Sequence, residues 1–458
     1  MNLPGKRKIL NEKKIQDEKD MLERARRILG RDITPIDHER MEKFVSSCNE
    51  HAFLFMQVVA DYGSPLYVVD RGGLVRDLNR LREAFARLPG EVDIFYALKS
   101  NSMPEIMSVL VREGAGIDVS SGMELGRAVK AGAKSIIFSG PGKTDEELSS
   151  VIDHAGRVTL MIDSFGELDR IDRLTRDRNV VIRAGVRLAT GSDGLWRRFG
   201  IPLSELRSFI EKADRCPFIE LEGLQFHTSW NLTPGAQVSF IEKLGETLSE
   251  LPVMLLRELE FIDLGGGYWP EHGEWLRSGG TEAGMLRNLL MPEKPDTTSR
   301  YIMESTDIET FAGEIAAALR RSLPKQVACR FFIEPGRWLC HQNMHILMTV
   351  VDVKADDMII TDAGTGAVGW ERYEHDYFPV INLSSPGSVE HQCGIFGPLC
   401  TPHDVWGYSC FGGRAGQGDV LLVPAQGAYT YSLRQEFIKP LPGIAVVQGP
   451  LDLRWSSI

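Results

Sequence analysis

The sequence contains no apolar run long enough to cross a membrane, and its cysteines show no pattern of a disulfide framework. Its best apolar runs, such as residues 346–351, are far shorter than the roughly 20 residues of a spanning helix. The basic residues at the N-terminus are followed by further charged residues, a pattern unlike a secretory signal. The seven cysteines are scattered, without a CxxC pair. This disfavours disulfides and a structural zinc site and predicts a reducing, cytoplasmic location.

The charge balance and the size of the chain narrow its class. The formal net charge of −11 disfavours nucleic acid or an anionic membrane as the main partner. The 458 residues, 43% of them hydrophobic, can bury a large core divided into two or three units.

Strand signals alternate with helix signals through the middle of the chain, and glycines mark many of the joins. Apolar, β-branched segments occur at residues 92–98, 117–119, 135–139, 158–162, 181–188, 219–227, 259–264 and 331–334. Eight strands, most of them followed by a helix, predict an α/β fold with a closed (β/α)8 TIM-like barrel. An open doubly wound sheet is the alternative.

We predict four regions along the chain. Residues 1–45 form a charged N-terminal extension, and residues 46–75 contribute a strand to a second domain. Residues 76–338 form the barrel, and residues 339–458 form an all-β domain because only short strand signals remain there. The long segment 268–307 is interpreted as a surface insertion in the barrel.

Chemically reactive side chains occur where the predicted barrel strands end. Lys99 ends the first strand, at the mouth where barrel enzymes carry catalytic groups. A lysine in this position is commonly a surface residue with a partly buried stem. However, His227, the triple glycine 265–267 and Glu334 with Arg337 follow other strands. Each has an ordinary structural explanation alone, but together they predict a site at one barrel mouth.

Six motifs in order resemble the fold-type III decarboxylases of the diaminopimelate and ornithine decarboxylase family. The resemblance covers roughly residues 55–450. The motifs are Tyr-Ala-Leu-Lys-Ser-Asn (96–101), Gly-Ile-Asp-Val-Ser-Ser-Gly-Met-Glu-Leu (116–125), Gly-Gly-Gly (265–267), Glu-Pro-Gly-Arg (334–337), Gly-Pro-Leu-Cys (397–400) and Gly-Ala-Tyr (427–429). Their common order is a much stronger signal than any one of them.

The resemblance implies a pyridoxal 5′-phosphate cofactor and gives roles to the motif residues. Lys99 would carry the cofactor as a Schiff base, with Asp118 nearby. His227 would stack on the pyridine ring. Glu334 would keep the ring nitrogen protonated, so that a quinonoid intermediate can form after decarboxylation. Related racemases place an arginine at that nitrogen, so Glu334 favours decarboxylation.

The resemblance also implies a phosphate site and an active site shared between two chains. Backbone N–H groups of Gly265, Gly266 and Gly267 would cradle the phosphate, and Gly336, Arg337 and Tyr429 would complete the cofactor site. Cys400 would reach the barrel of a second subunit and protonate the substrate carbon. The implied assembly is therefore a homodimer.

The chain departs from the family where substrate is recognised. The usual serine after the histidine motif is replaced by Trp230, and Ser229 or Asn231 is the candidate substitute. The acid that usually follows the cysteine is missing, so Asp404 is the nearest candidate for binding substrate, together with Arg372, Tyr377 and Cys400. The lysine that commonly precedes Phe199-Gly200 is also replaced by an arginine.

These departures predict the same reaction on a different small-molecule substrate. We expect decarboxylation of a diaminopimelate-, ornithine- or lysine-like amino acid, or of a modified, acylated or carrier-bound one. A racemase of the same fold type and a non-catalytic regulatory homologue are the alternatives.

Overall fold

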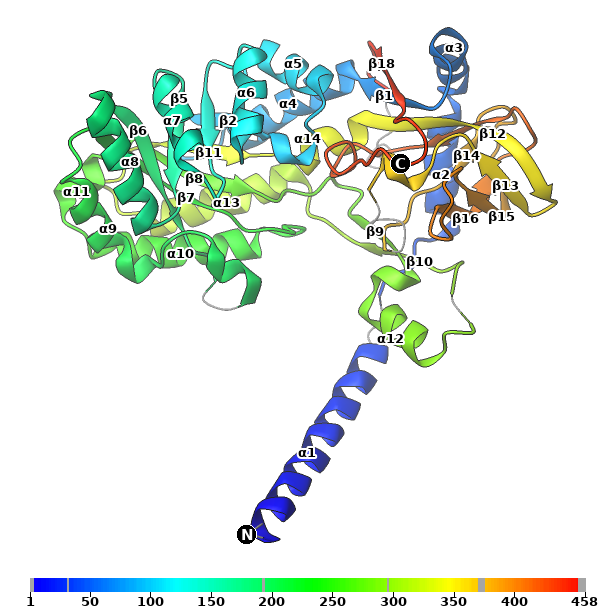
Figure 1. The fold of residues 1–458 in the computed structure, drawn as a ribbon, viewed down its shortest axis with the longest axis horizontal. Helices are drawn as coiled ribbons and strands as arrows, with labels where there is room; N and C mark the ends of the chain where they lie inside the picture. Colours follow the sequence, from blue (N-terminus) through cyan, green and yellow to red (C-terminus); the bar gives the residue numbers. More distant parts are fainter. Residues whose placement is uncertain (1–3, 31–32, 192–193, 295, 370–374, 452–458) are drawn as a thin grey trace.

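The computed structural model describes residues 4–30, 33–191, 194–294, 296–369 and 375–451. A parallel barrel and a β-rich domain lie side by side, and helix α1 (Pro4–Leu29) projects away from both (Figure 1). Within the described residues, no helix combines the length and the apolar character that crossing a membrane requires.

Eight parallel strands close the predicted barrel, in the order β11-β2-β3-β4-β5-β6-β7-β8. They are β2 (Val92–Ala97), β3 (Gly116–Val119), β4 (Ile136–Phe138), β5 (Val158–Ile162), β6 (Ile182–Leu188), β7 (Ile219–Phe226), β8 (Phe261–Gly266) and β11 (Arg330–Glu334). Each overlaps one predicted strand, so the TIM-like fold is confirmed and the open-sheet alternative is wrong. Phe95, Ile137, Met161, Phe261 and Phe332 form a separate buried cluster inside the barrel.

Helices surround the barrel, and several begin at side-chain caps. The surrounding helices are α4 (Arg71–Phe85), α5 (Pro104–Arg112), α6 (Gly122–Lys130), α7 (Asp145–Asp153), α8 (Phe165–Arg178), α9 (Leu206–Ala213), α10 (Gly235–Ser249), α11 (Val253–Arg257) and α13 (Ile308–Ser322). Ser121 and Ser164 cap α6 and α8, and Thr144 forms a capping box with Glu147 at α7. These caps satisfy N–H groups that the first helical turn leaves without a backbone partner.

The β-domain is an eight-stranded sheet with the order β13-β15-β16-β14-β17-β12-β1-β18. Its strands are β12 (Met344–Ala355), β13 (Met358–Thr361), β14 (Ile381–Asn382), β15 (Glu390–Phe396), β16 (Val405–Phe411), β17 (Val420–Val423), β18 (Gly443–Val447) and the early β1 (Leu66–Asp70). Strand β1 pairs antiparallel with β12 and parallel with β18. The chain therefore begins this domain before it builds the barrel, and it completes the domain afterwards.

Two N-terminal helices belong to the β-domain and not to a solvated extension. Helices α2 (His38–Asn49) and α3 (Ala52–Tyr62) bury Met41, Phe44 and Phe55 in a core shared with Leu347 and Leu422 of the sheet. The predicted boundary at residue 45 falls inside α2, so the extension ends earlier than we predicted. The insertion 268–307 contains the two-stranded sheet of β9 (Glu274–Arg277) and β10 (Arg300–Met303), with α12 (Glu282–Leu290) between the strands.

Candidate active site

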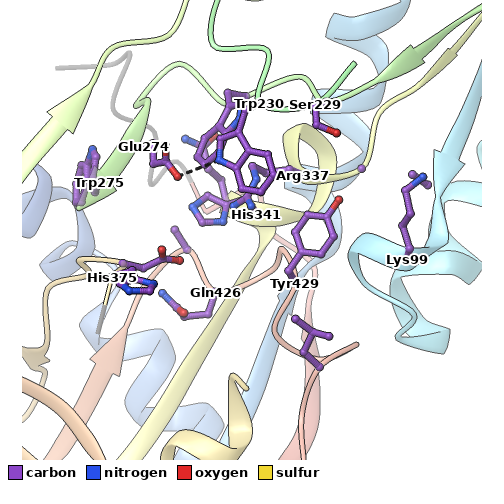
Figure 2. Close-up of a pocket in the computed structure, with 18 of the residues that line it drawn as sticks. Lys99, Ser229, Trp230, Glu274, Trp275, Arg337, His341, His375, Gln426 and Tyr429 are labelled. Carbon is purple, nitrogen blue, oxygen red and sulfur yellow. Dashed lines mark hydrogen bonds between the residues drawn. The ribbon is translucent and has the colours of Figure 1, made fainter. Parts of the chain in front are cut away.

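A cavity of about 980 Å³ lies where the carboxyl ends of the barrel strands meet the β-domain. Lys99, His227 and Glu334 line it from the barrel, and Tyr429 lines it from the β-domain. Figure 2 shows Lys99 at one side of the cavity and Trp275 at the other. The strand-end residues that the sequence singled out therefore face a common space.

Lys99 lies in a short 3-10 turn, Leu98–Ser100, directly after β2. Its Nζ is 3.3 Å from Oδ2 of Asp118, a buried carboxyl on β3 opposite Ala97. Burial alone would lower the pKa of Lys99, but the charges of Asp118 and Glu334 outweigh that effect and raise it. Burial raises the pKa of Asp118, and the Lys99 ammonium opposes the rise. The pair therefore holds Lys99 as an ammonium ion at the mouth of the cavity.

Glu334 is a fully buried carboxyl at the end of β11. Its Oε1 accepts a hydrogen bond from the amide of Gln225, and its Oε2 lies 3.3 Å from Nδ1 of His227. Burial would raise the pKa of Glu334, but the hydrogen bond from His227 and the charges of Lys99 and Arg187 hold it below its usual range. Glu334 is therefore an ionised carboxylate in a buried position, able to hold a proton on a facing basic nitrogen.

The triple glycine follows β8 but does not present three free N–H groups to the cavity. The N–H of Gly265 donates to Oδ1 of Asp263, and the N–H of Gly266 faces Nδ1 of His227 at 3.2 Å. Of the three glycines, only Gly267 lines the cavity. The predicted cradle of Gly265, Gly266 and Gly267 is therefore too wide, because the N–H groups of the first two glycines face the side chains of Asp263 and His227.

These glycines are nevertheless required by the close packing of the strand ends. Gly265 and Gly267 have φ values of +70° and +85°. Residues other than glycine rarely adopt such positive backbone angles. A Cβ on Gly267 would lie 2.6 Å from the carbonyl oxygen of Thr228, and a Cβ on Gly266 would collide with the carbonyl oxygen of Glu334. Glycine is therefore required at these positions by the neighbouring backbone.

Arg337 lies between two aromatic rings. Its guanidinium carbon is 4.1 Å from the Trp269 ring centre and 5.1 Å from that of Tyr429. Tyr429 is tied to the lysine segment, because its N–H donates to the carbonyl of Ser100 over 2.7 Å. The two aromatic contacts orient a permanent positive charge toward the cavity.

The loop after β7 shows which of Ser229 and Asn231 is placed to substitute for the serine that the family usually has here. Asn231 is buried, and its side-chain amide donates to the carbonyls of Gly266 and Thr228. Ser229 lines the cavity (Figure 2). Trp230 has a φ of +53°, is 63% exposed and donates from Nε1 to Glu274. Asn231 therefore braces the loop, whereas Ser229 is placed to contact a ligand.

The predicted substrate residues divide three ways. Tyr377 lines the cavity, and its hydroxyl is 3.0 Å from a guanidinium nitrogen of Arg300. Asp404 does not fit the predicted substrate contact: it is buried, and its carboxylate accepts N–H groups of Thr365 and Leu399. It shapes its own loop. Cys400 is exposed and does not line this cavity. Arg372 lies outside the described residues.

Comparisons with known proteins agree with this geometry. Residues 71–278 match the family model of the pyridoxal-dependent decarboxylase, pyridoxal binding domain. A diaminopimelate decarboxylase of Methanothermobacter thermautotrophicus is 25% identical over 87% of this chain and 90% of its own length. The family match and this relative support a fold-type III pyridoxal-phosphate-dependent decarboxylase. This confirms the family resemblance, the decarboxylase activity and the pyridoxal phosphate cofactor that the motifs implied.

Two further relatives of this decarboxylase act on modified amino acids. An L-glutamyl-[BtrI acyl-carrier protein] decarboxylase of Niallia circulans is 26% identical over 81% of this chain and 85% of its own length. A 2-[(L-alanin-3-ylcarbamoyl)methyl]-2-hydroxybutanedioate decarboxylase of Staphylococcus aureus is 25% identical over 80% of this chain and 89% of its own length.

The solved structures agree with the fold of this decarboxylase. Diaminopimelate decarboxylase of Helicobacter pylori with L-lysine superposes with a TM-score of 0.70 and 22% identity. That comparison covers 86% of this chain and 94% of the solved one.

The decarboxylase site also contains residues that sequence reasoning missed. Arg187, in β6, lines the cavity, donates to the carbonyl of Ser139 and packs 4.6 Å from the Phe199 ring centre. The position of Arg187 near the end of a predicted barrel strand could have identified it as a residue of the site. Trp269 and His272 come from the insertion, where sequence alone gave no indication that the chain turns back over the barrel mouth.

Proposed function

We propose that this decarboxylase binds pyridoxal phosphate covalently through Nζ of Lys99 and releases carbon dioxide from a modified amino acid. The observation that carries the proposal is the buried, ionised Glu334 in the same cavity as Lys99. When bound, the cofactor's ring accepts the electron pair that remains after carbon dioxide leaves. That acceptance requires a protonated ring nitrogen, and Glu334 would hold this proton.

Other residues of the chain would fix the cofactor's position. Arg337 supplies a positive charge held between Trp269 and Tyr429, and Gly267 lines the same cavity. Together with Ser229 they form a set of groups suited to a phosphate. His227, whose Nδ1 lies 3.3 Å from Oε2 of Glu334, would present its ring to the pyridine face.

We further propose a homodimer in which Cys400 of one subunit donates a proton to the substrate carbon in the other. Its exposed position on the 397–404 loop supports this role, since a group that acts in a partner must be accessible. The loop is held in shape by the buried Asp404. The relatives that act on a carrier-bound and an amide-linked amino acid support a modified substrate.

The proposal is tested by locating the cofactor and by measuring the gas. Borohydride reduction of the holoenzyme followed by peptide mapping is expected to place the pyridoxyl group on Lys99. Lys143, whose Nζ is buried against Glu167 at 2.8 Å, is the internal control and stays unmodified. Lys99→Ala is expected to lose both the cofactor's visible absorbance and carbon dioxide release. A pyridoxyl group on another lysine contradicts the assignment.

The same preparation distinguishes the two alternatives. A racemase would invert the α-carbon without releasing carbon dioxide, and a regulatory homologue would do neither. Chiral analysis of the amino acid alongside the gas measurement therefore separates all three activities.

A further inference from the structure

The cavity continues well past the residues that would hold the cofactor. In Figure 2, Trp275, His375 and Gln426 lie on the side opposite Lys99, with Arg337 and Tyr429 between them in this view. We call His272, Trp275, His341 and Gln426 the distal wall. All four line the cavity and are less than 10% exposed. None of them belongs to the motifs that carry the family resemblance.

Two histidines of the distal wall form a rigid stack. The rings of His272 and His341 are 4.9 Å apart and nearly parallel, with an interplanar angle of 12°. The side-chain amide of Gln342 lies 2.8 Å from Nδ1 of His272. Because an amide nitrogen can only donate, Nδ1 accepts, and the ring proton of neutral His272 is on Nε2. Burial and then the charge of Arg337 lower the pKa of His272 to about 3, so the ring is neutral at physiological pH.

Gln426 presents a buried acceptor that the described part of the chain leaves unused. Its Nε2 donates to the carbonyl of Pro424 over 3.0 Å, whereas its Oε1 has no hydrogen-bond partner among the described residues. The backbone of Gln426 is fixed, because its N–H donates to Met344 and its carbonyl accepts from Thr430. Buried amide oxygens are normally paired, so this atom points to a donor supplied by a ligand.

The charges around the distal wall indicate which donor it accepts. Arg337 already acts on His272, so a second cation beside this ring would be repelled. Glu274 and Asp376 also line the cavity, but both are half-buried, and Glu274 accepts from Trp230. The deeply buried surface instead combines a neutral amide, a neutral imidazole and an indole. Such a surface suits a planar, uncharged group that both donates and accepts hydrogen bonds.

We infer that the distal wall binds an amide-like group on the substrate side chain, with Oε1 of Gln426 accepting its N–H. The inference rests on the proposed function and specifies its substrate class: an amino acid whose distal amine is acylated. Gln426 is then a specificity-determining residue, and the distal wall selects an acylated amine over a free ammonium.

The experiment compares matched pairs of ligands on the holoenzyme. Each of 2,3-diaminopropionate, 2,4-diaminobutyrate, ornithine and lysine is titrated free and as its side-chain N-acetyl derivative, and norleucine serves as the ligand without a donor. The change in cofactor absorbance reports the dissociation constant without requiring turnover. For at least one chain length, the acetylated form is expected to bind at least about tenfold more tightly than the free amine.

Two substitutions at Gln426 then assign this preference to its side chain. Gln426→Leu is expected to weaken binding of the preferred acetylated ligand about tenfold or more, with little change for norleucine. Gln426→Glu is expected to reverse the preference toward the free amine, since a carboxylate pairs with an ammonium. Cofactor absorbance is expected to be unchanged in both variants, which separates this result from loss of the cofactor site.

Three outcomes would overturn the inference. One is tighter binding of the free amine at every chain length. Another is an acetyl preference that Gln426→Leu leaves intact, and the third is that no member of the panel perturbs the cofactor. If the wild-type holoenzyme instead fails to carry pyridoxal phosphate on Lys99, the proposed function itself is wrong.

Discussion

Nζ of Lys99 lies 3.3 Å from Oδ2 of Asp118, and Oδ1 of the same carboxylate accepts a 2.6 Å hydrogen bond from Ser139. The carboxylate is fully buried, so its charge acts on the lysine with little screening by solvent. This relationship determines how readily the lysine amine becomes neutral, and only the neutral amine attacks an aldehyde.

Replacement of Asp118 by asparagine is expected to shift cofactor capture to lower pH. The Asp118 charge raises the pKa of Lys99, so its removal lets burial lower that pKa, and the neutral amine forms at a lower pH. We expect the midpoint of the pH dependence of the capture rate to fall by about one to three pH units. Stopped-flow absorbance of apoprotein mixed with pyridoxal phosphate across pH measures this. Ser139→Ala keeps the charge of Asp118 and should shift the midpoint much less. An unchanged midpoint in Asp118→Asn would contradict the electrostatic effect of Asp118 on Lys99.

Replacement of Glu334 by glutamine is expected to slow the chemical step while the cofactor stays bound. The amide cannot hold a proton on a pyridine nitrogen, so the loss should be about 10²–10⁴-fold, as for other positioned proton-handling groups. Single-turnover release of carbon dioxide measures the step, and cofactor absorbance serves as the control for binding. Wild-type turnover in Glu334→Gln would show that the carboxylate plays no part in the reaction.

Replacement of Asp404 by alanine is expected to destabilise the 397–404 loop. The N–H groups of Thr365 and Leu399 would lose their carboxylate partner, at a cost of about 1–3 kcal/mol for each buried donor. Urea unfolding measures the fall in the free energy of unfolding. Substrate affinity in the fraction that remains folded should change little, because Asp404 contacts its own loop. A large loss of affinity without loss of stability would restore it as a substrate contact.

The barrel could be predicted from the sequence because its strands are buried on both faces. Such strands give largely apolar runs, and the runs at residues 158–162 and 181–188 coincide with β5 and β6 to within one residue. Strand β15 gives only a weak signal in the sequence, because it is only partly buried and contains His391, Gln392 and Gly394. Helix α2 was overlooked because charged residues mask its apolar face, yet Met41, Phe44, Val45 and Cys48 follow the i, i+3, i+4, i+7 spacing.

The site was predictable only where it depends on the barrel. Parallel strands bring their carboxyl ends to one mouth, so Lys99, His227 and Glu334 had to lie near one another. The use of the glycine N–H groups depends on the positions of the Asp263 and His227 side chains, which have no clear signal in the sequence. His272 and Gln426 approach the cavity from an insertion and from the second domain, and their position is determined by tertiary packing.

The role of Cys400 can be tested by mixing two inactive variants. Lys99→Ala lacks the residue that would hold the cofactor, and Cys400→Ala lacks the proposed proton donor. If the site is shared, a hybrid dimer contains one complete site. Random exchange makes about half the dimers hybrid with one good site in two, so recovery reaches at most about a quarter of wild-type activity. Activity is assayed after exchange has been verified with differently tagged subunits. Verified exchange without recovery would contradict a Cys400 that acts across the interface, whereas recovery requires that the two residues serve one site from different chains.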